Sequence, residues 1–242
     1  MPINSVNVLR ELAQQQSRRP FLARGSKVNR CPVCLMAQVH CLCEHDVSRA
    51  CQAAVCCLFY QGEVFKPSNT GRLIADVVPD NHAFLWHRTE HAPALLALLN
   101  NPCYQPIVVF PHQYAEPERA IHEVHDLPEL SHKRPLFIFL DGTWREAKKM
   151  FRSPYLADLP VLGIQPEQAS SYLLREAAHL HQLCTAEVAI EVLRGCGEWQ
   201  AANALSEHFS RFKRAYLAAK ANIRRPLPPL TSDDATPLSD TK

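Results

Sequence analysis

Four cysteines near the start of the chain have the spacing of metal ligands. They form the pattern C-x-x-C followed by C-x-C, at Cys31, Cys34, Cys41 and Cys43. Four thiolates on such short turns can surround one tetrahedral Zn²⁺ ion, which favours sulfur. A site with four sulfur ligands leaves no open position for a reaction, so the pattern predicts a structural zinc. The alternatives are an iron–sulfur cluster, a group of free thiols, or replacement of one sulfur by His40 or His45.

The second segment that could carry chemistry is an aspartate between a strand and a helix. Asp141 follows the apolar run at 136–140 and precedes a pattern typical of a helix at 144–152. Thr143 and Glu146 fit the S/T-x-x-E capping box, which opens a helix at Trp144. Such an aspartate is often a turn former, but at the exit of a buried strand it is also a candidate base.

Short apolar runs alternate with helical patterns over most of the chain. We expect strands at 54–60, 83–86, 107–110, 136–140 and 160–164, and helices near 69–78, 92–100, 144–152 and 185–194. This alternation predicts an α/β fold with a parallel sheet covered by helices. Ligands of such sheets bind beyond the carboxyl ends of the strands. The site should therefore be lined by segments 60–70, 111–114, 141–145 and 163–172.

Composition and charge narrow the function further. The chain has 7 glycines among 242 residues, and their positions match neither G-x-G-x-x-G nor G-x-x-x-x-G-K-[ST], which excludes the common phosphate-binding loops. The net charge of +2 averages over two basic runs, at 18–30 and 211–225, that contain no acidic residue. Two such runs suit a polyanionic partner.

A final helix is predicted from Trp199 onwards. Its apolar face is formed at spacings of three and four by Trp199, Ala202, Leu205, Phe209, Phe212 and Tyr216. Lys213 and Arg214 then lie on the outer face. That basic face is either a solvated surface or a contact with nucleic acid.

The chain divides into a basic leader at 1–30, a metal-binding lobe at 31–46, an α/β body at 50–225 and a tail at 226–242 that we expect to be disordered. The polar N-terminus lacks the apolar core of a signal peptide, and no run approaches the roughly 18 apolar residues of a membrane span. We therefore expect a cytoplasmic protein without membrane contact. Its thiols would stay reduced there.

Several of these motifs resemble one known family. Asp141-Gly-Thr-Trp144, followed by Arg-Glu-Ala-Lys-Lys-Met, is similar to the D-x-T-W signature of the DTW-domain family, in particular its bacterial tRNA-uridine aminocarboxypropyltransferases. The likeness extends over residues 30–220 and includes the cysteine pattern, Lys66-Pro-Ser-Asn-Thr-Gly-Arg-Leu-Ile-Ala-Asp76, Pro111 and Thr185-Ala-Glu-Val-Ala. One position differs, because the family commonly has histidine where this chain has Gln61. We therefore assign no role of that histidine to Gln61.

The resemblance implies transfer of the 3-amino-3-carboxypropyl group from S-adenosylmethionine to N3 of a tRNA uridine, expected in the variable loop, with release of methylthioadenosine. It also implies a fold similar to the SPOUT superfamily, with a C-terminal trefoil knot, in a monomer or a homodimer without an obligate protein partner. An RNA methyltransferase of the SPOUT type and a zinc-containing RNA-binding module without activity are the competing functions.

Residue roles follow from the same resemblance. Asp141 is the candidate base or holds the amino group of the cofactor, and Glu63 is the second choice unless it is an exposed loop carboxylate. The cofactor-binding candidates are Phe110, Pro111, Leu140, Gly142, Thr143, Leu162, Ser171, Tyr172 and Thr185.

A further group of residues is expected to contact tRNA. Asn69 and Thr70 are equally ordinary as helix caps, Trp144 is equally suited to filling the core, and each charged residue could be a solvated surface charge. The tRNA candidates are Lys66, Asn69, Thr70, Arg72, Trp144, Arg145, Lys148, Lys149, Arg175, Lys213 and Arg214.

Overall fold

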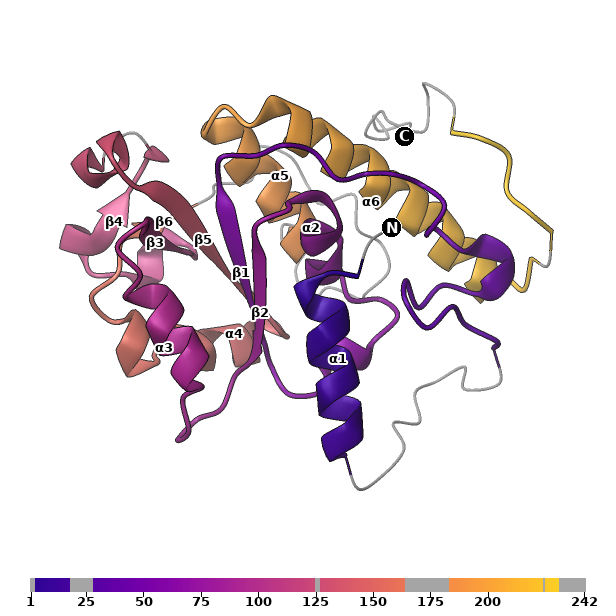
Figure 1. Ribbon diagram of the computed structural model, residues 1–242, viewed down its shortest axis with the longest axis horizontal. Helices are drawn as coiled ribbons and strands as arrows, with labels where there is room; N and C mark the ends of the chain where they lie inside the picture. The colour runs from indigo at the N-terminus through magenta and orange to yellow at the C-terminus, as the bar shows by residue number, and fades with distance from the viewer. Residues whose placement is uncertain (1–2, 18–27, 125–126, 164–182, 224, 231–242) are drawn as a thin grey trace.

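A parallel β-sheet forms the centre of the computed structural model, as the alternating pattern predicts (Figure 1). The structure describes residues 3–17, 28–124, 127–163, 183–223 and 225–230. Within them the sheet has six strands in the order β2-β1-β5-β3-β6-β4, and every neighbouring pair is parallel. The strands are β1 (Ala54–Phe59), β2 (Asn81–Leu85), β3 (Tyr104–Val109), β4 (Ala120–Ile121), β5 (Arg134–Asp141) and β6 (Val161–Leu162).

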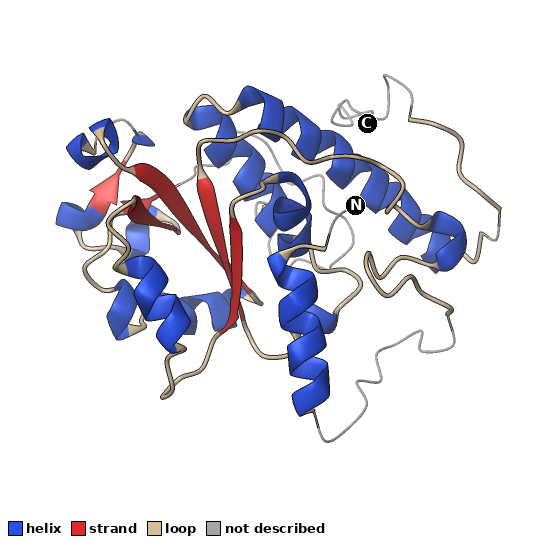
Figure 2. Ribbon diagram, viewed as in Figure 1, coloured by secondary structure: helices blue, strands red, loops and turns tan. Residues whose placement is uncertain are grey.

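Helices cover both faces of this sheet, so the molecule has three layers (Figure 2). One face is covered by α2 (Gly71–Val77), α5 (Thr185–Gly195) and α6 (Trp199–Lys220), and the other by α3 (Pro93–Leu99) and α4 (Trp144–Phe151). The α/β fold class predicted from the sequence is confirmed. All of β1 and the run 136–139 of β5 are buried, which explains why these sequences are apolar on both faces of the sheet.

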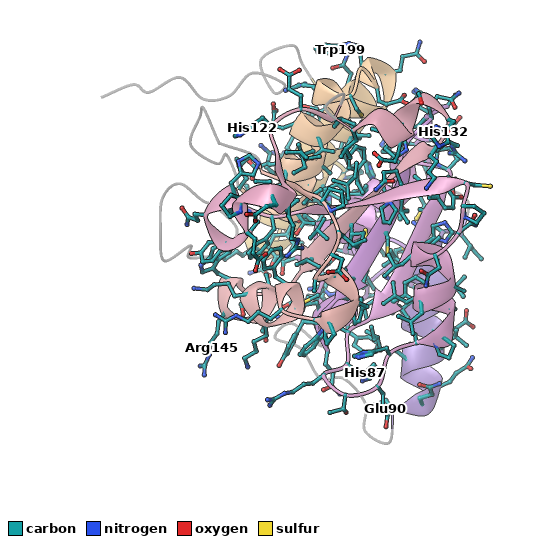
Figure 3. All side chains as sticks on the ribbon, turned by 90° about the vertical axis from the view of Figure 1, so that its left-hand side faces the viewer. His87, Glu90, His122, His132, Arg145 and Trp199 are labelled. Carbon is teal, nitrogen blue, oxygen red and sulfur yellow. The ribbon has the colours of Figure 1, made fainter. Side chains whose placement is uncertain are left out.

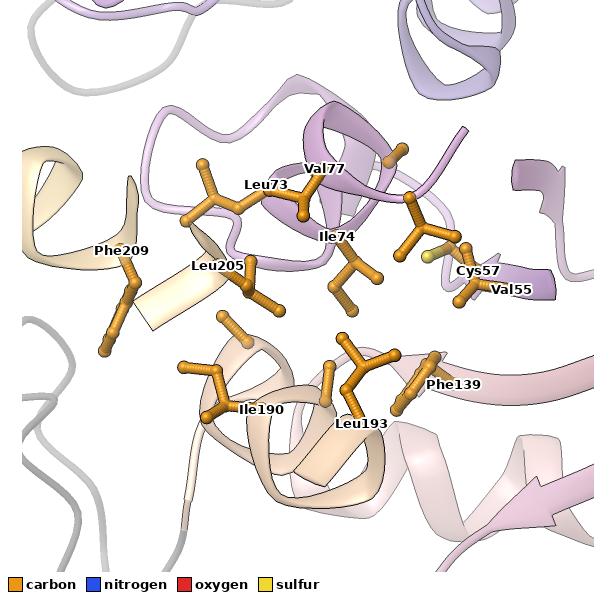
Figure 4. Packing of buried hydrophobic residues seen from close by; sticks show 14 of the residues in the cluster. Val55, Cys57, Leu73, Ile74, Val77, Phe139, Ile190, Leu193, Leu205 and Phe209 are labelled. Atoms are coloured by element: carbon orange, nitrogen blue, oxygen red, sulfur yellow. The ribbon is translucent and has the colours of Figure 1, made fainter. Parts of the chain in front are cut away.

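The larger of the two cores lies between the sheet and α2, α5 and α6 (Figure 4). Leu73, Ile74 and Val77 of α2 point from one side, and Ile190 and Leu193 of α5 meet them from the other. The spacing of three and four residues on each helix is the reason that one apolar face is presented to the sheet.

A first helix, α1 (Ser5–Gln16), packs against the edge strand β2 and was not predicted from the sequence. Asn4 caps it, since its Oδ1 accepts a hydrogen bond from the backbone N–H of Asn7 at 3.0 Å. Its Nδ2 also donates to Asp76 Oδ1 on α2 at 2.6 Å. The other oxygen of Asp76 lies 2.9 Å from Nε2 of His208, a fully buried residue of α6. One carboxylate therefore ties three helices together.

Some expectations need correction or fall outside the described residues. Trp199 is 59% exposed, because it is the first residue of α6 and lies beyond the apolar face that begins at Ala202. Residues 164–182, residues 18–27 of the basic run and the tail from 231 lie outside the described residues, so the expected C-terminal knot stays a prediction. No helix in the described ranges is long and apolar enough to cross a membrane.

The Asp76–His208 pair generates a prediction about stability. Removing a buried hydrogen-bonding group leaves its partners unsatisfied, which typically costs about 1–3 kcal/mol for each partner, and Asp76 has two such partners, Asn4 and His208. We expect Asp76→Ala to lower the free energy of unfolding by the sum of these two costs in urea denaturation. Arg194→Ala, which breaks an exposed pair with Glu191 on α5, should change it by less than about 1 kcal/mol. Equal effects of the two substitutions would contradict the assigned role of Asp76.

Candidate functional site

The helices that follow the neighbouring strands β1 and β5 lie on opposite faces of the sheet. After β1 the chain enters α2 on one face, and after β5 it enters α4 on the opposite face. Helices that leave neighbouring parallel strands toward opposite faces open a crevice at the carboxyl edge, where ligands of such sheets bind. Phe59 and Asp141, the last residues of β1 and β5, are register partners at this point.

Asp141 is held in the crevice by the start of α2. Its side chain is buried at 2% exposure, and Asn69 Nδ2 donates a hydrogen bond to Asp141 Oδ1 at 2.6 Å. The oxygen of the same amide accepts a hydrogen bond from the backbone N–H of Arg72 at 3.1 Å, so Asn69 also caps α2. A Cβ atom at Gly71 would lie 2.5 Å from Asp141 Oδ2. Only glycine allows the helix to approach the carboxylate this closely.

Glu63 lies in the same loop region, on a short 3₁₀ turn, η2 (Glu63–Phe65), that follows β1. It is buried at 1% exposure, so the alternative of an exposed loop carboxylate is wrong. Lys66 Nζ lies 2.5 Å from Glu63 Oε1. The lysine that was expected to contact tRNA therefore has an internal partner in this structure.

The loop after β5 forms the predicted cap of α4. Glu146 Oε2 accepts hydrogen bonds from the backbone N–H of Thr143 at 2.7 Å and from its hydroxyl at 2.6 Å, which confirms the capping box. Trp144 then stacks on Phe110 from the loop after β3, with ring centroids 5.3 Å apart and planes inclined by 12°. Lys148 Nζ lies 5.4 Å from the centroid of the Trp144 ring.

The cofactor candidates come from five chain segments, and the structure describes four of these. Phe110 and Leu162 are joined by a backbone hydrogen bond of 3.1 Å between the ends of β3 and β6. Leu140, Gly142 and Thr143 lie at the end of β5, one strand away from Phe110 and Pro111. Thr185 is the first residue of α5. Ser171, Tyr172 and the tRNA candidate Arg175 lie outside the described residues.

The side chains beside Thr185 contact the start of α2. Thr70 hydrogen-bonds to the thiol of Cys184, the residue before Thr185. Burial raises the pKa of that thiol well above its usual value, so it acts as a packing residue rather than as a nucleophile.

The basic tRNA candidates differ in accessibility. Arg145 and Lys149 are exposed on α4, and Arg145 projects away from the body of the protein (Figure 3). Lys213 lies over the ring of Phe209 at 4.9 Å, and Arg214 donates to the carbonyl oxygen of Pro228 at 2.9 Å. Arg72, by contrast, is 3% exposed, with its guanidinium 5.3 Å from the ring of Phe212. This buried position does not suit a direct contact with a phosphate.

Phe151 and Arg152 were missed by the sequence analysis, whereas Tyr114 was covered by the expected segment 111–114. Tyr114, Phe151 and Arg152 line a cavity beside α4 together with Lys148. Phe151 gave no signal of its own, because aromatic residues at helical spacing are normally assigned to the core.

The four cysteines converge as their spacing predicts. All four Sγ atoms lie within 4.8 Å of one another, with Cys31 and Cys43 at 3.6 Å and Cys34 and Cys41 at 3.7 Å. A tetrahedral site with metal–sulfur bonds of about 2.3 Å places its sulfurs about 3.8 Å apart. The group can therefore hold a metal ion. His40 is not part of it, since its Nε2 lies 2.8 Å from the carbonyl oxygen of Ile223.

The chain matches the family model of the DTW domain over residues 28–217. No solved structure matches it. The match includes the cysteine group, Asn69, Asp141 and most of α6, and it fits a tRNA-modifying enzyme. This protein therefore belongs to the DTW-domain family.

Proposed function

We propose that this protein transfers the 3-amino-3-carboxypropyl group of S-adenosylmethionine to N3 of a tRNA uridine, with the variable loop as the expected position. The observation that carries the proposal is the buried Asp141 carboxylate, oriented by Asn69 in the crevice between β1 and β5. Membership of the DTW-domain family supports the same substrate class.

The residues of the crevice suit this co-substrate. Its sulfonium and its amino group are positively charged, and the crevice region contains two buried carboxylates, Asp141 and Glu63. It has no phosphate group, so the lack of a glycine-rich phosphate loop is not an obstacle. The sulfonium supplies a leaving group that departs as neutral methylthioadenosine without help from an acid.

The chain's own residues then have two tasks in the transfer. The walls of the crevice must hold the uridine N3 in line with the γ-carbon of S-adenosylmethionine rather than with its methyl group. The imide proton must also leave N3 as the new N–C bond forms. We assign Asp141 as the base that accepts this proton, because the hydrogen bond from Asn69 fixes its orientation and its neighbours keep it out of bulk water.

We further propose that the cysteine group holds zinc. Burial raises the pKa of the Cys31 thiol, but hydrogen bonds from the backbone N–H groups of Cys34 and Val33, with those from the Cys41 and Cys43 side chains, together lower it to about 7. Burial raises the pKa of the Cys34 and Cys43 thiols, and ionised sulfurs nearby raise it further. A divalent cation removes this repulsion and stabilises all four thiolates. A cytoplasmic location, which we also propose, would keep these thiols reduced.

The first test is an assay with unmodified tRNA and S-adenosylmethionine, followed by mass analysis of the nucleosides. We expect an added aminocarboxypropyl group and methylthioadenosine as the co-product. Addition of a methyl group with S-adenosylhomocysteine would instead identify a methyltransferase. Binding of tRNA without turnover would identify a binding module.

Asp141→Asn should slow the transfer by at least about 100-fold, the usual contribution of a general base, with unchanged affinity for S-adenosylmethionine by calorimetry. Asp158→Asn, an exposed control, should retain full activity. If Asp141→Asn mainly weakens S-adenosylmethionine binding, the residue holds the amino group of the cofactor. Wild-type turnover in this variant would remove Asp141 from the mechanism.

Elemental analysis tests the metal centre. We expect one zinc ion per chain in the wild-type protein and its loss in Cys34→Ser. Cys103→Ser, which changes an exposed cysteine outside the group, should keep the metal. A folded wild-type protein without metal would contradict the proposal, and iron in place of zinc would indicate a cluster.

Charge reversal tests the basic face of α6. Each phosphate contact that is lost should flatten the dependence of log affinity on log salt concentration by about 0.7–0.9. We expect the double variant Lys213→Glu/Arg214→Glu to bind tRNA more weakly. Its slope of log affinity against log salt concentration should be shallower by the amount expected for about two lost phosphate contacts. Arg194→Glu on α5 is the control. An unchanged slope in the double variant would show that this face is only a solvated surface.

A further inference from the structure

A cavity of about 340 Å³ lies beside α4, on the face of the sheet opposite to α2. Its walls come from the loop after β3, from the second half of α4 and from the turn that follows α4. This volume is in the range of small-molecule binding sites, about 300–1,000 Å³. Asp141 does not line the cavity, since its side chain bonds to Asn69 before α2, but Phe110 of the cavity wall is also one of the cofactor candidates.

The aromatic wall of the cavity is a rigid stack. Phe110 lies between Phe151, at 4.4 Å between ring centroids and 16° between planes, and Trp144. Tyr114 meets the edge of this stack, 5.5 Å from Phe110 and 5.4 Å from Trp144. Phe110 and Phe151 are buried, whereas Tyr114 is 36% exposed. Tyr114 is therefore the ring of this wall that an incoming planar group can reach, and Lys148 Nζ lies 5.5 Å from the centroid of the same ring.

Arg119 braces the cavity, with its guanidinium 5.5 Å from the centroid of the Phe151 ring. Its guanidinium donates to the carbonyl oxygens of Leu159 and Leu156 at 2.9 and 2.7 Å and to Glu116 at 2.9 Å. These bonds join the loop after β3 to the turn after α4. The cavity is thus held open by residues of the protein, so binding would require little reorganisation.

The charge around the cavity points to an anionic ligand. Glu116 is the acidic residue of the lining and is already bonded to Arg119, which leaves Lys148 and the exposed Arg152 facing the cavity. An aromatic ring for stacking and two cations for a phosphate together match one nucleotide. S-adenosylmethionine has no phosphate, and its one anionic group is the carboxylate of the 3-amino-3-carboxypropyl group, which must lie at the reaction centre.

We propose that this cavity, between Tyr114 and the Lys148–Arg152 side of α4, binds one nucleotide of the RNA substrate next to the uridine that reacts at Asp141. The inference rests on the proposed function for its choice of RNA. It assigns Tyr114 to base stacking and Lys148 and Arg152 to the adjoining phosphate. Stacking tolerates any base, so the contact would position the RNA strand rather than select its sequence.

The test compares three variants of the full-length protein, with unmodified tRNA transcripts as the probe and no S-adenosylmethionine present. Tyr114→Leu should raise the dissociation constant for tRNA by about 5- to 100-fold, the usual effect of removing one stacked base contact. Tyr114→Phe should bind like the wild type because it keeps the ring. Trp199→Leu, which removes an exposed aromatic residue far from α4 (Figure 3), is the control.

Two further measurements distinguish a contact with RNA from a structural effect. Irradiation of tRNA that contains 5-iodouridine should produce a cross-link to Tyr114, located by mass spectrometry. In the transfer assay, Tyr114→Leu should raise KM for tRNA while kcat at saturating tRNA and the affinity for S-adenosylmethionine stay unchanged.

The outcomes separate this inference from the proposed function. If Tyr114→Leu binds tRNA as the wild type does, or loses affinity for S-adenosylmethionine instead, the nucleotide site is wrong and the transferase remains. If tRNA binding depends on Tyr114 but the wild type forms no product, the nucleotide site stands and the proposed reaction falls. A wild-type protein that binds no tRNA overturns both.

Discussion

The close approach between the first turn of α2 and the end of β5 is the constraint on which the site depends. It exists because residue 71 has no side chain, since a Cβ atom there would lie 2.5 Å from Asp141 Oδ2. Asn69 uses this proximity to cap α2 with its amide oxygen and to hold Asp141 with its amide nitrogen. The side chain of Asn69 thus both caps α2 and fixes the position of Asp141, an acid that is distant in the sequence.

The helix α2 in turn depends on elements far from the crevice. Asp76, near its end, bonds to Asn4 before α1 and to His208 of α6. Arg10 of α1 donates to the carbonyl oxygens of Pro32 and Val33, between two of the four clustered cysteines, at 2.7 and 2.9 Å. The metal-binding lobe is therefore linked to the candidate base through α1 and α2. This arrangement gives a structural metal a physical route by which it can support the site without entering the reaction.

Local signals were predictable from the sequence, and contacts between distant segments were not. The capping box at Thr143 and the cysteine spacing involve residues a few positions apart, so their chemistry is visible in the sequence. The bond from Asn69 to Asp141 spans 72 positions, and α2 is too short for its register to be fixed by periodicity. The two-residue strand β4 has no pattern of its own. Trp199 was misassigned because a helical face continues in sequence beyond the point where the core ends.

The four residues from Asp141 to Trp144 show how one short motif serves both faces of the sheet. Asp141 is the last residue of β5, and its side chain bonds to Asn69 at the start of α2. Gly142 lets the chain pass between two neighbours, since a Cβ atom there would lie 3.1 Å from that of Glu146 and 3.2 Å from that of Tyr60. Thr143 starts α4 through its capping box, and Trp144 then reaches Phe110 on the opposite side. A change at any of these positions would alter the alignment between the acid and the aromatic stack, because rigid elements continue from both ends of the motif.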